Sequence, residues 1–125
     1  MGNPLPRMLY VEDDAAVRQS VQRILASEYE LTSAENGAVA LNLLGTNDYD
    51  IILSDIEMPL MNGVTLYEIV AKSKPEQARR FVFYSGGYGA DIARRLNNIP
   101  DLKLLPKPIN LTVFRTTLAS VAKGK

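Results

Sequence analysis

The sequence contains neither cysteine nor histidine. The absence of cysteine excludes disulfides, thiolate catalysis and cysteine-based metal sites. The absence of histidine excludes a serine–histidine catalytic pair, a histidine-rich zinc site and a phosphohistidine carried by the chain itself. Chemistry in this chain therefore depends on carboxylates, hydroxyls, amines and backbone groups.

An excess of charge of one sign is also lacking. The chain has 14 Lys and Arg residues and 14 Asp and Glu residues, so its formal net charge is zero. No overall field favours a nucleic acid or an anionic membrane. No apolar run approaches the roughly 18 to 20 residues of a membrane span, and residues 1–9 lack the hydrophobic segment of a signal peptide. We therefore expect no direct nucleic-acid partner, no membrane partner and a cytoplasmic location.

The length of 125 residues corresponds to one domain with a single sizeable core. Hydrophobic residues make up 46% of the chain and charged residues 22%, as in ordinary globular proteins. Gly2, Pro4 and Pro6 disfavour a regular element at the start of the chain. The expected organisation is a disordered leader at residues 1–6, one domain at 7–122 and a tail at 123–125.

Short apolar runs alternate with segments of helical periodicity along the chain. Strands are predicted at residues 7–11, 29–34, 51–55, 80–84 and 102–105. Helices are predicted from Ala15, with Asp13 or Asp14 as its cap, and at residues 38–44, 64–72, 90–97 and 111–121. The predicted inward positions include Ile24, Leu41, Ile69, Ile92 and a stripe of Leu111, Phe114, Leu118 and Val121. This alternation predicts a five-stranded parallel α/β sheet with helices on both faces.

Breakers define several boundaries of these elements. Gly45 is expected to end the second helix, and Lys74-Pro75 the third. The loop after Asp55 carries Pro59 and Asn62-Gly63. Pro106 at the fifth strand is best tolerated at an edge of the sheet, so this strand is predicted to be an edge strand.

Chemistry-bearing side chains follow four of the predicted strands. They are Glu12 and Asp13 after the first, Asp55 at the end of the third, Ser85 after the fourth and Lys107 after the fifth. The carboxyl ends of parallel strands meet at one edge of the sheet, where ligands bind in open α/β folds. We therefore expect these side chains to lie close together.

Clustered carboxylates repel one another unless a cation is present. Oxygen ligands without histidine or cysteine suit Mg2+, with the Glu57 backbone carbonyl as a further ligand. Such a site supports phosphoryl transfer with Asp55 as the nucleophile. Lys107 would neutralise phosphoryl charge, and the Ser85 hydroxyl would bond a phosphoryl oxygen.

The ordered motifs of the chain resemble the receiver domain of two-component response regulators (the CheY-like family). They are Val11-Glu12-Asp13-Asp14, Asp55-x-x-Met58-Pro59-x-Met61-Asn62-Gly63, Ser85-Gly86 and Lys107-Pro108. The resemblance covers residues 7–121 and implies a flavodoxin-like fold of strand order 2-1-3-4-5 with five helices. It also implies a cis Lys107-Pro108 bond.

The resemblance further implies a function. Asp55 would receive a phosphoryl group from a histidine kinase or a histidine phosphotransfer protein. Mg2+ would be held by Asp13, Asp55 and the Glu57 carbonyl, with Glu12 assisting through water. An output partner or a homodimer would use the face formed by helix 90–97, strand 102–105 and the last helix.

Two positions qualify this picture. The family often has Tyr or Phe three residues before the lysine, where this chain has Leu104, and Tyr84 or Tyr88 could substitute for it. The residues that tune phosphoryl lifetime in the family correspond here to Glu57 and Gly87. We therefore expect Glu57, with no side chain at position 87 to obstruct it, to affect that lifetime.

Each of these residues has a simpler explanation when taken alone. The acids 12–14 could only cap a helix, Asp55 and Ser85-Gly86-Gly87 could only form turns, and Lys107 could be a solvated surface residue. Arg94 and Arg95 could form a solvated face or part of a docking surface. The joint occurrence at successive strand ends favours the functional interpretation of the strand-end residues.

Three other functions compare less well with the sequence. A haloacid-dehalogenase-type phosphatase also uses a strand-end Asp with Mg2+, and Asp55-Ile56-Glu57 resembles its acid pair, but no cap domain fits in 125 residues. An interaction module that needs no phosphate remains open. A dinucleotide function is poorly supported because no G-x-G-x-x-G motif follows the first strand. The chain could be a stand-alone regulator or a domain of a hybrid sensor kinase.

Overall fold

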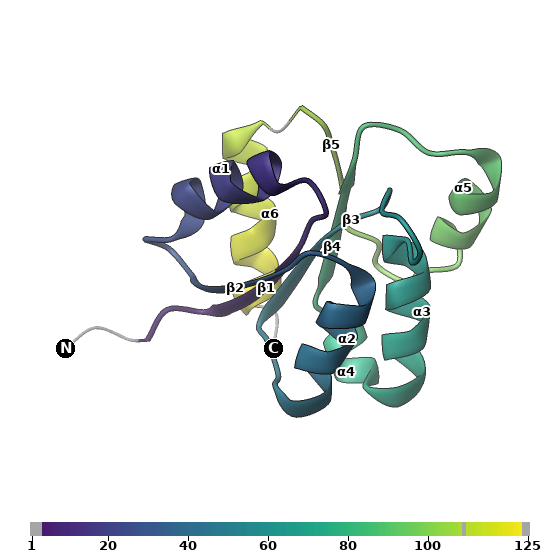
Figure 1. Cartoon of the computed structure of the whole chain (residues 1–125), viewed down its shortest axis with the longest axis horizontal. Coiled ribbons are helices and arrows are strands. Elements are labelled where there is room, and N and C mark those ends of the chain that lie inside the picture. The colour runs from purple at the N-terminus through teal and green to yellow at the C-terminus, as the bar shows by residue number, and fades with distance from the viewer. Residues whose placement is uncertain (1–3, 109, 124–125) are drawn as a thin grey trace.

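In the computed structural model, which describes residues 4–108 and 110–123, five parallel strands form one sheet in the order β2-β1-β3-β4-β5 (Figure 1). The strands are β1 (Arg7–Val11), β2 (Glu30–Ala34), β3 (Ile51–Asp55), β4 (Phe81–Ser85) and β5 (Leu104–Pro106). The helices are α1 (Ala15–Leu25), α2 (Gly37–Thr46), α3 (Gly63–Ser73), α4 (Pro75–Ala78), α5 (Ala90–Leu96) and α6 (Leu111–Lys123). The predicted flavodoxin-like fold is confirmed.

The sheet has a buried centre and two partly exposed edges. All five residues of β3 and all five of β4 are buried, because helices cover both faces of these strands. β2 and β5 form the edges. Pro106 ends β5 at this edge, as predicted. An edge strand tolerates proline because the sheet loses no hydrogen bond when the backbone N–H is absent on the open side.

Helices cover both faces of the sheet (Figure 1), and one hydrophobic layer lies on each face. α1 and α6 cover one face through Val21, Leu25, Phe114, Leu118 and Val121. α2, α3, α4 and α5 cover the other through Ala40, Leu44, Leu66, Val70, Ala78 and Leu96. Loops that carry polar groups follow the carboxyl ends of the strands, although Ile56 and Met58 after β3 still belong to the second layer.

Side-chain caps fix the starts of three helices at that edge or near it. Asp14, one of the two predicted caps, accepts hydrogen bonds from the backbone N–H groups of Ala16 and Val17. Asn36 and Asn62 cap α2 and α3 in the same way. Each cap satisfies helix N–H groups that have no partner within the helix.

Some predicted boundaries are wrong. α2 continues through Gly45 to Thr46, so this glycine does not end the helix. Pro75 does not merely close α3, since it occupies the first turn of the short helix α4, where proline's missing N–H costs nothing. The fold therefore has six helices among its described residues, not five.

Three predicted inward side chains are exposed. Ile24 and Ile69 are 37% and 39% exposed, because each precedes a buried residue and the helix turns it about 100° away. Leu111 is 42% exposed. It is the first residue of α6, and helical side chains lean toward a preceding turn that is absent there.

The predicted leader and tail lie partly outside the described residues, namely at residues 1–3 and 124–125. Residues 4–6 belong to no helix or strand, and Lys123 is the last residue of α6. The assignment of residues 1–6 and 123–125 as leader and tail stays a prediction.

Gly63 sits where the chain after β3 turns back against its own backbone. A Cβ atom built there would lie 2.3 Å from the Asp55 carbonyl oxygen and 3.0 Å from the Ser54 Oγ. We expect Gly63→Ala to lower the free energy of unfolding by about 2 to 3 kcal/mol, measured by urea denaturation.

Gly45→Ala provides the matched control, since no heavy atom lies within 4 Å of a Cβ at this helical position. It should raise stability by about 0.5 to 1 kcal/mol. Equal effects of the two substitutions would contradict the close approach at Gly63.

Candidate functional site

Strand periodicity places three site residues on one face of the sheet. Residues two apart on a strand point to the same side. Glu12, Asp55 and Lys107 each come two positions after a core side chain on the face covered by α1 and α6. They therefore lie at the carboxyl edge of the sheet, directly after the last core side chains of that face.

Lys107 bridges two buried carboxylates. Its Nζ lies 3.1 Å from Asp55 Oδ2, to which it donates a hydrogen bond, and 3.7 Å from Glu12 Oε1. Asp55 is 4% exposed and Glu12 is 1% exposed. The ammonium thus compensates negative charge that would otherwise be costly in a desolvated position.

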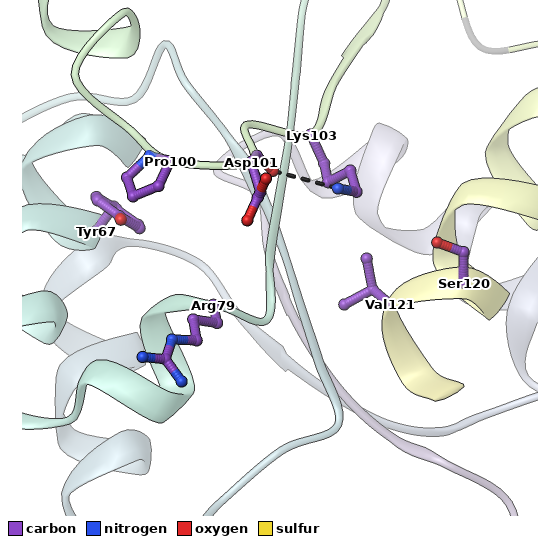
Figure 2. Close-up of a pocket in the computed structure, with 7 residues that line it drawn as sticks. All are labelled: Tyr67, Arg79, Pro100, Asp101, Lys103, Ser120 and Val121. Carbon is purple, nitrogen blue, oxygen red and sulfur yellow. Dashed lines mark hydrogen bonds between the residues drawn. The ribbon is translucent and has the colours of Figure 1, made fainter. Parts of the chain in front are cut away.

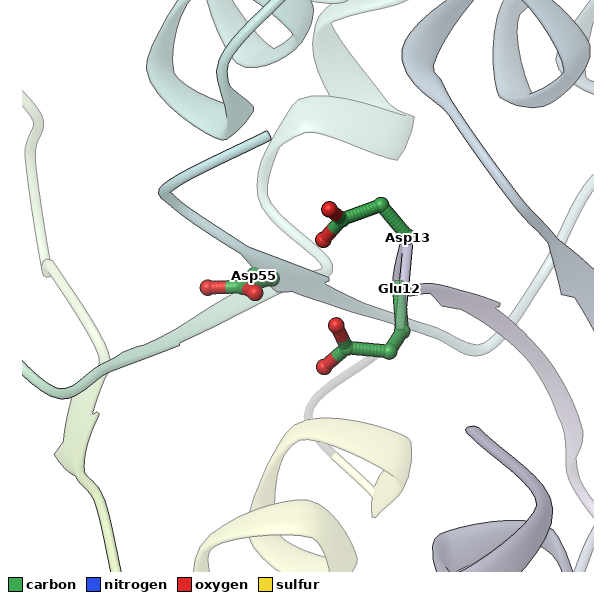
Figure 3. Close-up of side chains that lie close together, drawn as sticks. All are labelled: Glu12, Asp13 and Asp55. Atoms are coloured by element: carbon green, nitrogen blue, oxygen red, sulfur yellow. The ribbon is translucent and has the colours of Figure 1, made fainter. Parts of the chain in front are cut away.

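The acids from β1 and β3 converge (Figure 3). One carboxylate oxygen from each of Glu12, Asp13 and Asp55 lies within 4.8 Å of the others. Asp13 is exposed and the other two are buried, so the cluster has an open side. Hard oxygen donors at this spacing fit a small divalent cation such as Mg2+.

Glu12 is held at both carboxylate oxygens. The Tyr84 hydroxyl donates to Oε1, and the Asp14 backbone N–H donates to Oε2 at 3.1 Å. Arg18 Nη1 donates to the Glu12 carbonyl oxygen at 2.7 Å. Burial raises the pKa of the Glu12 carboxyl above its ordinary value, while the hydrogen bonds from Tyr84 and Asp14 oppose that rise.

The raised pKa of Glu12 predicts a pH dependence of stability. The folded protein keeps this proton to a higher pH than the unfolded chain does. In metal-free buffer, the free energy of unfolding should therefore fall as pH rises from the ordinary pKa of 4.5 through the raised one. Glu12→Gln should flatten that fall, as followed by urea denaturation in a chelator from pH 4 upward. An exposed control, Glu30→Gln, should keep the wild-type slope, and a wild-type slope in Glu12→Gln would contradict the prediction.

Ser85 closes a small turn beside the acids. Its Oγ donates to the Gly87 carbonyl oxygen at 2.8 Å and accepts from the Gly87 N–H at 3.1 Å. The Lys107 backbone N–H donates to the Ser85 carbonyl oxygen at 2.9 Å. The loop that carries Ser85 and the loop that carries Lys107 are thereby tied together.

The predicted site residues share one open hollow of about 550 Å³. Glu57 also lines it, and the Glu57 N–H donates to Asp55 Oδ1 at 3.3 Å. The full lining consists of Glu12, Asp13, Asp14, Val17, Asp55, Glu57, Ser85, Gly86, Gly87 and Lys107. The Lys107-Pro108 bond is cis, as the resemblance implied.

Another hollow, of about 320 Å³, lies where β4 and β5 begin, at the opposite edge of the sheet (Figure 2). It is lined by Tyr67, Arg79, Pro100, Asp101, Lys103, Ser120 and Val121. Lys103 Nζ donates to the Asp101 carbonyl oxygen at 3.2 Å. Among the described residues of this lining, Asp101 is the single carboxylate, so they do not form an acid cluster like that of the first hollow.

The sequence did not reveal the role of Tyr10 and Tyr84 beneath the acids. Both lie in apolar strands and are fully buried, so they look like ordinary core residues. The available signals were the position of Tyr10, two residues before Glu12, and the position of Tyr84 on the neighbouring buried strand β4. Leu104 is half-buried against the other core layer, and Tyr88 is 41% exposed.

Comparison with known proteins agrees with this architecture. Residues 8–119 match the family model described as "Response regulator receiver domain". "Sensor kinase CckA" of Brucella abortus (strain 2308) is 36% identical over 114 residues, which cover 89% of this chain and 12% of CckA. "Protein-glutamate methylesterase/protein-glutamine glutaminase" of Azospirillum brasilense is 32% identical over 86% of this chain and 28% of that protein. The chain therefore spans less than a third of either relative.

A solved structure extends the fold comparison. The signal receiver domain of a signal transduction histidine kinase from Syntrophus aciditrophicus superimposes with a TM-score of 0.84 at 21% identity, covering 95% of this chain and 91% of that one. Within residues 4–108 and 110–123, none of the helices combines the length and hydrophobicity of a membrane span.

Proposed function

The chain belongs to the response regulator receiver domain family of two-component signalling, and from that premise we propose that it is a phosphorylation-dependent switch whose phosphoacceptor is Asp55. The donor would be a histidine kinase or a histidine phosphotransfer protein. The observation that carries this proposal is the position of Asp55, beside Lys107 and within the acidic cluster.

The proposed step is a displacement at phosphorus. A carboxylate oxygen of Asp55 attacks the phosphorus of the donor's phosphohistidine, an O–P bond forms, and the P–N bond breaks. The electron pair of that bond stays on the imidazole nitrogen, and the product is an acyl phosphate. Lys107 holds Asp55 in place beforehand and neutralises phosphoryl charge afterwards.

Ser85 supplies the second phosphoryl contact in this proposal. Its hydroxyl currently donates to the Gly87 carbonyl, so it would rotate to donate to a phosphoryl oxygen instead. Glu12, Asp13, Asp55 and the Glu57 backbone carbonyl would hold Mg2+. When bound, that ion supplies positive charge to the equatorial oxygens of the transferred group.

Two further elements of the proposal concern lifetime and output. Glu57 lines the open hollow, and Gly87 presents no side chain there, so Glu57→Ala should change the rate of acyl phosphate hydrolysis.

We place the output or homodimer face on α5, β5 and α6. Arg94 is exposed on α5, whereas Arg95 is tied to Glu68 and Thr65 of α3 and is less free to contact a partner.

The test is phosphoryl uptake from acetyl phosphate, followed by intact-protein mass spectrometry with and without Mg2+. We expect the mass of one phosphoryl group per chain with Mg2+ and little or none in a chelator. Steady turnover of a generic phosphate ester would instead support the phosphatase alternative. Partner binding that ignores phosphorylation and survives Asp55→Asn would support a phosphate-independent interaction module.

A further inference from the structure

A chain of hydroxyls lies directly beneath the acidic pocket. Tyr84 and Tyr10 are both fully buried, and their hydroxyl oxygens are 2.7 Å apart. The Tyr84 hydroxyl also bonds Glu12 Oε1. Burial raises the pKa of both tyrosines, so both hydroxyls keep their protons.

The direction of this chain follows from its proton count. Tyr84 has one hydroxyl proton, and the Glu12 carboxylate can only accept. Tyr84 therefore donates to Glu12, and its oxygen accepts from Tyr10. The hydrogen bond to a carboxylate is charge-assisted and stronger than the bond between the two neutral hydroxyls.

Tyr84 also contacts the lysine of the pocket. Lys107 Nζ lies 4.6 Å from the centroid of the Tyr84 ring, within range of a cation–π attraction. Tyr84 pairs in register with Asp55 across β3 and β4, so its ring stands on the same face of the sheet, next to the phosphoacceptor. One side chain thus contacts both groups that flank Asp55.

We propose that Tyr84 is a positioning residue of the pocket, whose hydroxyl orients Glu12 toward the cation and whose ring holds the Lys107 ammonium against Asp55. The inference rests on the proposed function, because it assumes that the acids bind Mg2+ and that Asp55 is phosphorylated. The role of the hydroxyl and the role of the ring involve different atoms of the same side chain. They can therefore be separated by substitution.

The role of the Tyr84 hydroxyl follows from the hydrogen-bond partners of the Glu12 carboxylate. With Asp14 N–H on Oε2 and Tyr84 on Oε1, the carboxylate has a single orientation. Without the Tyr84 hydroxyl, the nearest remaining partner of Oε1 is Lys107, 3.7 Å away. The Glu12 carboxylate would then turn toward the ammonium and away from the other two acids, which should weaken the binding of Mg2+ while the ring still holds Lys107.

The first experiment compares Tyr84→Phe with Tyr10→Phe. Each removes one buried hydroxyl from the same pair, but Tyr84→Phe loses two hydrogen bonds and Tyr10→Phe loses one, so Tyr84→Phe should lower stability toward urea more. Only Tyr84→Phe removes the bond to Glu12. Calorimetric titration with Mg2+ alone should show about tenfold weaker binding for Tyr84→Phe, and near wild-type binding for Tyr10→Phe.

The second experiment separates the ring from the hydroxyl. Tyr84→Phe keeps the ring, so raising Mg2+ should restore its rate of phosphorylation by acetyl phosphate. Tyr84→Leu removes the ring as well, so its rate should stay about tenfold low even at saturating Mg2+. In addition, Mg2+ should shift the hydroxyl-bearing ring-carbon NMR signal of Tyr84 more than that of Tyr67, which lies outside the pocket lining.

The outcomes distinguish the two proposals. Equal Mg2+ affinities of Tyr84→Phe and Tyr10→Phe, with a wild type that binds Mg2+ and is phosphorylated, would overturn only the role of the hydroxyl. Recovery of Tyr84→Leu at high Mg2+ would overturn the role of the ring. A wild type that bound no Mg2+ would overturn this inference together with the Mg2+ site of the proposed function.

Discussion

Asp55→Asn should reduce phosphoryl uptake from acetyl phosphate by about 1000-fold or more, because it replaces the carboxylate nucleophile with a neutral amide that does not attack phosphorus. The asparagine side chain matches aspartate in size, and its amide oxygen can still accept from Lys107 Nζ. It lacks the negative charge that makes the carboxylate oxygen a nucleophile. The measurement is intact-protein mass spectrometry over time at saturating Mg2+.

A matched control uses an acid outside the pocket. Asp101→Asn makes the same chemical change at a residue with φ of 53°, a left-handed conformation that asparagine also tolerates. Asp101 does not line the acidic hollow. This variant should take up phosphate at the wild-type rate, whereas uptake by Asp55→Asn near that rate would show that another residue is the acceptor.

Lys107→Met should slow phosphorylation by about 100-fold, since it removes the cation that both orients Asp55 and neutralises phosphoryl charge. Methionine retains most of the side-chain length without the ammonium. Asp55 and Glu12 would then lie buried without their shared lysine, and the metal-free protein should lose about 1 to 2 kcal/mol of stability.

This substitution also makes a prediction about Mg2+. Without the lysine, nothing on that side chain offsets the electrostatic repulsion between the acids. Mg2+ should therefore raise the thermal unfolding temperature of Lys107→Met more than that of the wild type. Lys103→Met is the control, because Lys103 contacts the Asp101 carbonyl and lines the other hollow. Wild-type phosphorylation kinetics in Lys107→Met would contradict the assigned role of the ammonium.

The strand order could be anticipated from the resemblance to receiver domains, whereas the parallel sheet and the convergence of the site follow from local patterns. A branched apolar run such as Ile51–Leu53 identifies a buried strand, and parallel strands necessarily share a carboxyl edge. Groups at positions 12, 55 and 107 therefore had to approach one another. Their separations, and the fact that Lys107 spans two acids, depend on packing that no pattern specifies.

The partners of Tyr84 show where sequence patterns end. A tyrosine within an apolar strand has the same pattern as a core residue, and its hydroxyl partner Glu12 lies 72 positions away. Likewise, Leu111 fits the apolar periodicity of α6 and is nevertheless exposed at its first position. Periodicity does not show where a helix begins, and a side chain in its first position has no preceding turn to lean against.

Mapping the position of the phosphoryl group is the decisive measurement of whether Asp55 is the phosphoacceptor of the pocket. After treatment with acetyl phosphate and Mg2+, the acyl phosphate is reduced with borohydride and the modified peptide is sequenced by tandem mass spectrometry. The predicted result is modification at Asp55 alone, within the peptide that contains β3. Modification at Glu12, Asp13 or Asp14 with Asp55 untouched would show that Asp55 is not the phosphoacceptor.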